Sequence, residues 1–203
     1  MQSSPAEITP ILGTAMDGGH YAGRILIDGQ AYALIVAPKD GGERDDIEWS
    51  DNTRNVPAAM SFCDGHANTL AMAEAGSPLA QWARGLRIAG HDDWYLPSQD
   101  ELEVLYRNLK PTPRANYCWA RSGINLSAIA PTRPYAPDHP VQTSAEVFQA
   151  DGAEAFEEDA YWTSTQHAAD ADYAWYQYFD NGLQGDGGKG AQLRARAVRR
   201  LPI

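Results

Sequence analysis

The chain has 203 residues, of which 43% are hydrophobic and 10% aromatic, so it can bury a substantial core in one large domain or two small ones. This composition excludes extensive disorder for most of its length. The 27 acidic residues outnumber the 16 basic ones and give a formal net charge of -11, which argues against nucleic acid or an anionic membrane surface as a partner.

Residues 1–14 contain Ser and Pro and little periodicity, and we expect them to form an N-terminal arm. They lack a basic segment followed by a long apolar one, and no stretch of the chain approaches the roughly 18 apolar residues of a transmembrane helix. We therefore expect no membrane insertion. We expect synthesis as a soluble protein in the cytosol, from which it could still be assembled into an exported particle.

Two apolar segments, residues 21–27 and 31–37, flank Asp28-Gly29, a pair that predicts a tight β-hairpin turn. Residues 39–46 are charged and rich in glycine, which is typical of a solvated loop. A short strand is expected around Trp49.

Three helical segments are expected next. Residues 57–75 are rich in Ala, Met and Leu, and Ser77-Pro78 can start a second, short helix. The clearest helix begins with the S-x-x-E capping box of Ser98 and Glu101 and ends at Lys110. Apolar residues at helical spacing mark the face that this helix is expected to bury: Leu102, Leu105, Tyr106 and Leu109.

Residues 111–159 contain many prolines and few periodic runs, which indicates a long insertion within one domain that spans residues 15–203. The two cysteines, Cys63 and Cys118, lie far apart in the sequence. Two separate buried thiols are favoured over a single disulfide bond, because no export signal is visible.

The C-terminal region is rich in aromatic, polar and glycine residues, and its residues 174–179 alternate with the period of a strand. The face expected to pack on the core carries Trp175, Gln177 and Phe179. The face expected to meet water or a partner carries Tyr176, Tyr178 and Asp180. This second face has two interpretations: a binding surface built from rigid tyrosines, or tyrosines that simply cover a sheet.

The Asp180-Asn181-Gly182 sequence predicts a tight turn after this strand. A looser loop is expected over residues 185–190, and a single closing strand over residues 191–199. No residue pattern here or elsewhere is typical of a catalytic centre, so we expect no enzymatic activity, no cofactor and no metal ion.

Two acidic segments are candidates for cation binding. His91-Asp92-Asp93 could bind a cation through its carboxylates, but hydrogen bonding of Asp93 to local backbone is the favoured interpretation. The acidic residues between 40 and 48 are more typical of a solvated loop than of a calcium site, because they lack the required spacing.

Several motifs occur in the order found in one known family. The segment GHDDWYLPS, residues 90–98, is followed by Glu101-Leu102 and Leu105, and together they resemble the G-x-x-DW-R-LPT-x-x-EL-x-x-L motif of Lcl C-terminal-like domains. The second half of the family is matched by YWTST, Ala174-Trp175, Asn181-Gly182 and the closing RARAVR. Tyr95 and Ser98 depart from the usual basic residue and threonine, although serine is also a good helix N-cap.

The resemblance implies an α+β fold similar to C-type lectins and formylglycine-generating enzymes, with two helices, small antiparallel sheets, long loops and insertions. Members occur in phage tails or baseplates, in bacterial surface adhesins, and among the variable proteins of diversity-generating retroelements, whose diversified residues face outward on the C-terminal strands. By that resemblance, the ligand-facing residues of this chain would be His167, Tyr173, Tyr176, Tyr178, Asp180, Gln184 and Asp186.

The same resemblance implies a receptor-binding protein of a virion tail that attaches to the bacterial host. The insertion containing Ser144-Ala145 and residues 153–157 looks most like phage-encoded members. The implied partners are a host-surface protein or glycan and other tail or baseplate proteins, and a homo-oligomer such as a trimer is left open. The alternative is a bacterial cell-surface adhesin or glycan-binding protein.

Overall fold

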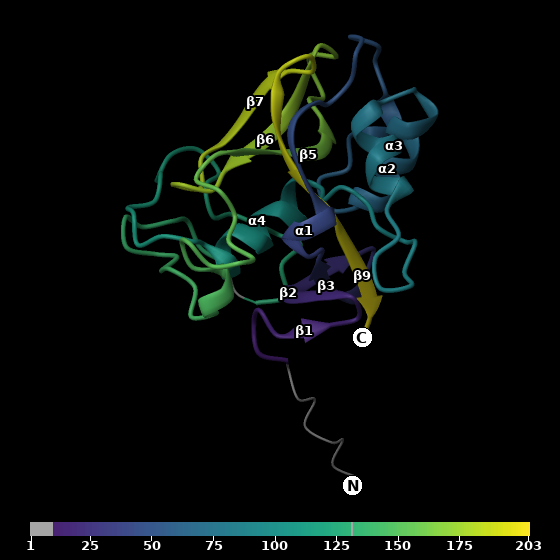
Figure 1. Cartoon of the computed structure of the whole chain (residues 1–203). Coiled ribbons are helices and arrows are strands. Elements are labelled where there is room, and N and C mark those ends of the chain that lie inside the picture. The colour runs from purple at the N-terminus through teal and green to yellow at the C-terminus, as the bar shows by residue number, and fades with distance from the viewer. Residues whose placement is uncertain (1–9, 131) are drawn as a thin grey trace, which may run out of the picture.

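The computed structural model describes residues 10–130 and 132–203, which form an α+β fold with two sheets and several helices (Figure 1). Residues 1–9 of the expected N-terminal arm lie outside the described residues. Near the end of the expected arm, Gly13 already belongs to the fold, because its N–H donates to the carbonyl of Tyr21 at 2.8 Å.

The first sheet is antiparallel and has the order β1-β2-β3-β9. Its strands are β1 (Ala15–Met16), β2 (Gly19–Ile27), β3 (Gln30–Val36) and β9 (Val198–Pro202). The hairpin expected from the Asp-Gly pair is confirmed: Asp28 and Gly29 have φ angles of 49° and 82°, the positive values that a type I′ turn requires.

The second sheet has the order β4-β8-β5-β6-β7 and places the C-terminal strands beside segments from earlier in the chain. Its strands are β4 (Glu43–Glu48), β5 (Ala160–Gln166), β6 (Tyr173–Tyr178), β7 (Gln184–Gly188) and β8 (Gln192–Arg196). The sheet is not wholly antiparallel, since β5 and β8 run parallel and pair Tyr161 with Arg194.

Two segments expected to be loops are strands in the structure. Residues 39–46 form α1 (Lys39–Gly42), one turn interrupted by non-helical backbone at Asp40 and Gly41, and then the start of the edge strand β4, in which residues 44–46 are exposed and the Glu43 side chain is buried. Residues 185–190 contribute most of β7, although glycine disfavours strands. The loop prediction was wrong in both places because it rested on the local composition. These segments become strands because a neighbouring strand supplies the hydrogen bonds that pair them into the sheet.

The expected single closing strand is in fact two strands, β8 and β9, which belong to different sheets. Ala197 is the junction: its carbonyl accepts from Ala37 N–H at 2.9 Å, and its N–H donates to Gly42 at 3.0 Å. The chain therefore crosses from the second sheet to the first without leaving the core.

Three helices have eight residues or more within the described residues, one more than the family fold implies: α2 (Gly65–Glu74), α3 (Pro78–Gly85) and α4 (Gln99–Leu109). Short 3-10 turns occupy Pro57–Ala59 and Glu146–Phe148. The first expected helix begins later than its composition indicates, because Asp64 caps it by accepting from Ala67 N–H at 3.0 Å. None of the helices in the described residues has the length and hydropathy needed to cross a membrane.

The capping box of α4 is confirmed, and Glu101 in it does more than cap. Its carboxylate is fully buried and accepts from Ser98 N–H at 2.7 Å, from Gly65 N–H at 3.0 Å and from the Tyr95 hydroxyl at 2.7 Å. One side chain thus joins the first residue of α2 and the N-cap residue of α4 to Tyr95 in the segment before α4. Burial raises the pKa of Glu101 to about 7, against the opposing effect of these donors.

The chain ends with a basic cluster of Arg194, Arg196, Arg199 and Arg200, whose charges are paired inside the fold. Arg196 is 0% exposed and bonds to Glu154 at 2.5 Å, while Arg199 holds both carboxylate oxygens of Asp93 at 2.8 and 2.9 Å. The sequence favoured hydrogen bonding of Asp93 to local backbone, but its carboxylate is held by a distant arginine. Sequence reasoning missed this pair because the two residues lie at opposite ends of the family motifs.

The described residues of the expected insertion, 111–130 and 132–159, are packed against the end of α4 through polar contacts. Lys110 is buried and donates to the Asn116 side-chain oxygen at 2.8 Å, and Asn116 in turn donates to the Pro140 carbonyl at 3.0 Å. Both cysteines are free thiols; Cys63 is half-buried, and Cys118 is exposed rather than buried as expected.

The Gly65→Ala substitution should destabilise the protein by about 1–3 kcal/mol, because a Cβ atom would lie 2.3 Å from Glu101 Oε2 and 2.4 Å from the Leu96 carbonyl. Gly85→Ala is the matched control at the end of α3, where a Cβ would meet nothing within 4 Å. Urea unfolding of both variants measures the difference. Equal stabilities would contradict the contact between α2 and Glu101.

The Glu101→Gln substitution should remove one component of the pH dependence of stability. The folded pKa of Glu101, about 7, lies above the usual 4.5, so the folded state binds the proton more tightly between these values. The unfolding free energy of the wild type relative to the variant should therefore fall as pH rises from about 4.5 to 7 and then level off. A difference that stays constant or rises across this range would show that the pKa is not raised.

Candidate functional site

The hairpin of β6 and β7 carries most of the residues expected to face a ligand. Its turn is tight, as expected: Gly182 has a φ of 78°, and its N–H donates to the Tyr178 carbonyl at 2.9 Å. A Cβ atom at Gly182 would lie 2.4 Å from Tyr106, so the turn also rests directly on α4. The hairpin is thereby held rigidly against the core.

Tyr176 and Tyr178 form one surface of the hairpin, which we call the tyrosine face together with Gly185 and Gly187 of β7. Tyr176 pairs with Gly185 across the strands. Its ring makes edge-to-face contacts with Tyr178 at 5.5 Å and with the buried Trp162 at 6.1 Å. Both tyrosines are half-buried, so each ring is supported by the fold and still reaches solvent.

The glycines of β7 make room for Tyr176. A Cβ atom at Gly185 would lie 2.7 Å from the Tyr176 hydroxyl oxygen, and one at Gly187 would lie 3.2 Å from the ring. The ring therefore lies across the bare backbone of β7. Burial raises the pKa of Tyr176, which keeps its hydroxyl protonated and able to donate.

Gln184 and Asp186 do not share this face. Gln184 pairs with Gln177, and Asp186 with Trp175, so both side chains lie on the opposite side of the hairpin from Tyr176. The family resemblance implied that both residues face a ligand, and the loop expected over residues 185–190 gave Asp186 no defined face. Once β7 is a strand, the two-residue period separates both from the tyrosines.

His167 and Tyr173 lie at the far end of the hairpin, on the side of Trp175. His167 N–H donates to the Tyr173 carbonyl at 3.0 Å, and the imidazole ring lies 5.4 Å from the Trp175 ring. Tyr173 is 39% exposed. Trp175 itself is half-buried, whereas Gln177 and Phe179, expected on the same face, are fully buried.

Asp180 lies at the turn and belongs to neither group. One carboxylate oxygen is 4.0 Å from Arg114 Nη1, and the other is buried without a hydrogen-bond partner among the described residues. The charge of Asp180 adds to burial in raising the pKa of Tyr106. The contacts of Asp180 are therefore with Arg114 and Tyr106 near the turn, and not with the outer surface of the hairpin.

On the side of the hairpin that carries Trp175 lies an amide cluster that we define as Gln99, Gln177 and Gln184. Gln99 Nε2 donates to Gln184 Oε1 at 3.3 Å. Four polar atoms here are buried and have no hydrogen-bond partner in the described part of the chain: Gln99 Oε1, Gln177 Oε1, Gln184 Nε2 and the indole nitrogen of Trp175. Buried polar atoms are normally satisfied, so these four atoms have hydrogen-bonding capacity that the described residues leave unused.

Sequence reasoning missed Gln99 and Gln177. Gln177 did carry a signal, because an amide on the face with Phe179 is a polar residue at a core position. Gln99 carried none, since it is the first residue of α4 and meets β7 only through the tertiary packing.

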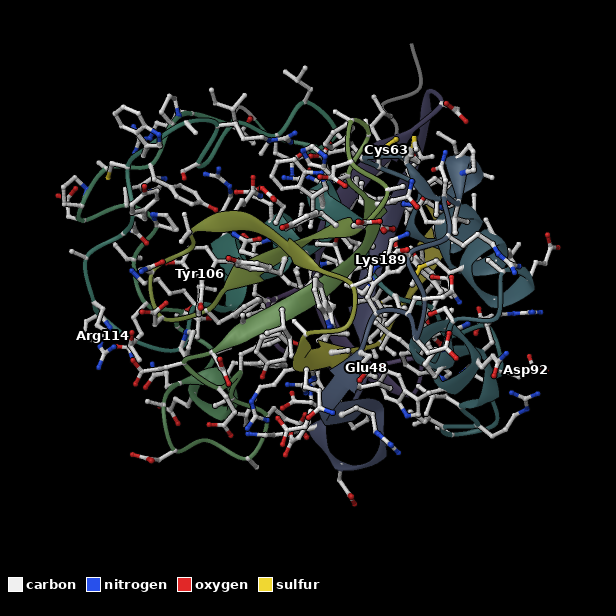
Figure 2. All side chains as sticks on the ribbon, turned by 90° about the horizontal axis from the view of Figure 1, so that it is seen from above. Glu48, Cys63, Asp92, Tyr106, Arg114 and Lys189 are labelled. Atoms are coloured by element: carbon white, nitrogen blue, oxygen red, sulfur yellow. The ribbon has the colours of Figure 1, made fainter. Side chains whose placement is uncertain are left out.

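The end of β7 is fixed by Lys189, which is 1% exposed and labelled in Figure 2. Its Nζ donates to Gln166 Oε1 at 2.7 Å and to the Arg54 carbonyl at 2.8 Å, and it lies 4.6 Å from the Trp49 ring centroid. Burial lowers the pKa of Lys189 to about 8. This anchor explains how a strand of mostly glycine residues keeps its position.

The His91-Asp92-Asp93 segment is the first of the two candidates for cation binding in the sequence. Asp93 is occupied by Arg199, and no group of three or more His, Cys, Asp and Glu side chains in residues 10–130 and 132–203 is arranged to hold a metal ion.

A comparison with protein-family models matches residues 42–199 to the Lcl C-terminal domain. The match includes α2, α4 and the whole second sheet, while the β2–β3 hairpin precedes it. A comparison with curated proteins gave no match.

The Gly185→Ala substitution should displace the Tyr176 ring and cost about 1–3 kcal/mol of stability, because the new methyl group would overlap the phenol. Gly188→Ala, in the same strand, is the control, since a Cβ there meets nothing within 4 Å. Chemical shifts of the Tyr176 ring protons and urea unfolding report the two effects. Unchanged shifts in Gly185→Ala would mean that the ring does not lie over β7.

Proposed function

This chain belongs to the Lcl C-terminal domain family, and on that premise we propose that it is a non-enzymatic recognition module with its binding surface on β6 and β7. Its role is to hold a ligand on a preformed surface without chemical turnover. The tyrosine face is the observation that carries the proposal.

The tyrosine face suits recognition because its rings are rigid before any ligand arrives. Tyr176 is supported by Trp162 on one side and by the glycine backbone of β7 beneath it. Tyrosine supplies a large amphipathic contact area with little conformational entropy to lose, and a preformed surface lowers the cost of binding. The hydroxyl groups then add directional hydrogen bonds.

The biological setting that we propose is a phage tail or baseplate, in which the module contacts a receptor on the bacterial host surface. The resemblance to phage-encoded members supports this setting, and other tail proteins would be its structural partners. Several copies on one particle would raise the overall avidity without any new contact. If a retroelement diversifies this copy, the variation would fall on outward positions such as Tyr176 and Tyr178.

The second candidate is a bacterial cell-surface adhesin or glycan-binding protein, and the amide cluster is what favours it. The unpartnered Oε1 atoms of Gln99 and Gln177 accept hydrogen bonds, while Gln184 Nε2 and the Trp175 indole donate them. Sugar hydroxyls both donate and accept, so a saccharide fits this mixture. The ligand would then approach the Trp175 side of the hairpin rather than the tyrosine face.

Replacing both Tyr176 and Tyr178 with Ala should weaken binding to host cells or purified receptor by roughly thirtyfold or more, since aromatic anchors contribute about 2 kcal/mol or more. Binding is measured by surface plasmon resonance or by cell adsorption, after circular dichroism has shown that the variant is folded. The double Phe variant keeps the rings and should retain most of the affinity.

The matched control is the double variant Ile11→Ala and Leu26→Ala. These side chains are 78% and 43% exposed, and they belong to the part of the molecule around β1 and β2, at the opposite end of Figure 1 from β6 and β7. The control should bind like the wild type. Equal binding by the folded tyrosine variant would refute the tyrosine face, and a loss confined to Gln184→Ala would favour the glycan-binding alternative.

A further inference from the structure

Strand β7 is an edge of the second sheet, because the strand order ends with it and β6 is its only partner strand among the described residues (Figure 1). Its pairing with β6 runs from Gln184 to Gly188 without a register shift. One long side of β7 therefore bears backbone groups that no strand in the described part of the chain pairs with.

The alternation of hydrogen bonds along the hairpin shows which groups these are. Tyr178 N–H donates to the Leu183 carbonyl at 2.9 Å, so residue 183 is a position that bonds to β6. Bonded and non-bonded positions alternate along an antiparallel pair, and the register continues this alternation through β7. The N–H and C=O groups of Gln184 and Asp186 therefore point away from β6 to the open edge, while those of Gly185, between them, bond to β6.

The two edges of this sheet differ in how they are protected. The first edge, β4, carries three successive charged residues, Arg44, Asp45 and Asp46, and its pairing with β8 has a register shift. Charges and irregular pairing are usual means by which an edge strand avoids pairing with another strand. β7 contains no proline, has no register shift and carries Asp186 as its one charged residue. Its edge is therefore open to the addition of a strand.

The glycines of β7 leave room for a second backbone. A Cβ atom at Gly188 would meet nothing within 4 Å, so packing inside the chain does not require glycine at this position. Gly185 and Gly187 admit the Tyr176 ring and present no side chain to an approaching strand. Glycine within a strand often marks the close approach of a ligand or another backbone. An added strand can therefore approach β7 to the usual spacing of about 4.8 Å.

The charge around this edge selects the residues that such a strand would carry. Residues 134–188 contain no lysine or arginine. Within the hairpin and the turn before it, Asp170, Asp172 and Asp186 are exposed carboxylates. Opposite charges on directly opposed residues stabilise a strand pair, and complementary potentials favour association. A basic side chain opposite Asp186 therefore matches the edge, and an acidic one would be repelled.

We propose that β7 binds an extended, basic segment of a partner polypeptide, which joins the second sheet as a sixth strand antiparallel to β7. The proposal rests on the recognition function given above and specifies its ligand as a polypeptide rather than a saccharide. Residues opposite Gln184 and Asp186 would bond to β7 through their backbone and place basic side chains on the Trp175 side. The residues between them would place apolar side chains beside Tyr176, on the tyrosine face.

A synthetic probe tests the proposal. A six-residue peptide of alternating lysine and valine, acetylated and amidated at its ends, is titrated into the full chain and followed by nitrogen-15 NMR. The amide resonances of Gln184 and Asp186 should shift saturably at millimolar peptide, and a peptide of alternating glutamate and valine should bind at least about tenfold more weakly. The absence of a saturable shift with the lysine peptide would overturn the proposal, and so would equal binding of the two peptides.

N-methyl groups on the probe locate its backbone contacts. In the proposed register the lysine N–H groups face β7 and the valine N–H groups face solvent. N-methylation of the lysines should weaken binding by at least about tenfold, whereas N-methylation of the valines should change it by less than about threefold. Equal effects, or effects in the reverse order, would contradict the added strand.

Asp186→Pro removes one outward N–H and leaves the bonds between β7 and β6 in place, since an edge strand tolerates proline where its N–H faces solvent. It should weaken binding of the lysine peptide by at least about tenfold relative to Asp186→Ala, which loses the same carboxylate but keeps the N–H. Circular dichroism shows whether both variants are folded. Equal binding by the two folded variants would overturn the proposal.

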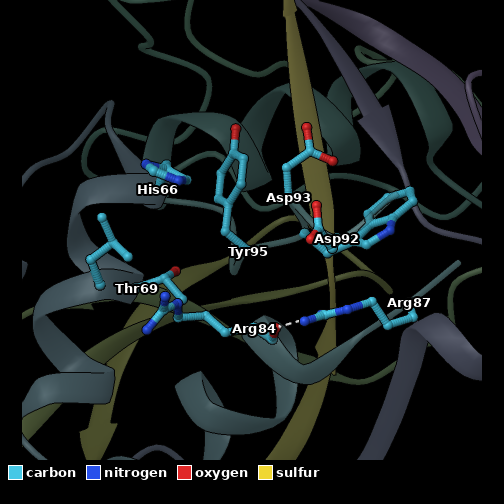
Figure 3. A pocket seen from close by; sticks show the side chains of 9 residues that line it. His66, Thr69, Arg84, Arg87, Asp92, Asp93 and Tyr95 are labelled. Carbon is cyan, nitrogen blue, oxygen red and sulfur yellow. Dashed lines mark hydrogen bonds between the residues drawn. The ribbon is translucent and has the colours of Figure 1, made fainter. Parts of the chain in front are cut away.

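The matched control is an exposed acid outside the second sheet. Asp92 lines a polar cavity of about 210 Å³ between α2, the end of α3 and the segment before α4, and Figure 3 shows it with Arg84 and Arg87. The two arginines make this surface unsuited to a basic peptide. Asp92→Ala should therefore bind the lysine peptide like the wild type, and a loss as large as that of Asp186→Pro would refute the placement of the site on β7.

Binding to host cells or purified receptor separates this proposal from the recognition function. A loss in the Tyr176 and Tyr178 double Ala variant but not in Asp186→Pro would keep the recognition function and overturn the added strand. A loss in both would support both. A loss in Asp186→Pro alone would support the added strand and refute the tyrosine face, and a loss in neither would overturn recognition by β6 and β7 altogether.

Discussion

The buried carboxylate of Glu101 is the contact on which the relative placement of α2, α4 and the segment before α4 depends. It holds the first residue of α2, the N-cap residue of α4 and the hydroxyl of Tyr95 around one pair of oxygen atoms. His66 follows Gly65 directly and lines the polar cavity, while Gln99 follows Ser98 and reaches β7. A buried carboxylate with three donors tolerates little displacement, so both neighbours are positioned by it.

The arginines of β8 and β9 also hold distant segments together, at the junction of the two sheets. The chain is strongly acidic, yet its basic C-terminal cluster is not free to attract an anionic polymer, because Arg196 and Arg199 are each paired with an acid from a distant segment. Breaking such a pair would leave a buried charge uncompensated, which is costly. These pairs therefore fix the place where the chain passes from β8 in the second sheet to β9 in the first.

The two faces of the β6–β7 hairpin differ in chemistry, so each would bind a different class of ligand. Tyr176 and Tyr178 offer rigid aromatic area over glycine backbone, whereas Gln184 and Trp175 cover amide groups whose hydrogen-bonding capacity is unused. A ligand that buries apolar area would select the first face, and one rich in hydroxyl groups would select the second. The alternation along β6 was visible in the sequence, but the assignment of Gln184 and Asp186 needed the register of β7.

The sequence by itself determined the features that depend on neighbours along the chain. The Asp28-Gly29 turn, the capping box of Ser98 and Glu101 and the turn at Gly182 were all predictable, because backbone conformation and side chain lie within a few residues. Only the tertiary structure decided that glycine-rich β7 is a strand, that Asp93 pairs with Arg199, and that Arg84, Asp92 and Trp94 surround one cavity. These features join segments far apart in sequence, and their energy comes from burial and hydrogen bonds that local patterns do not contain.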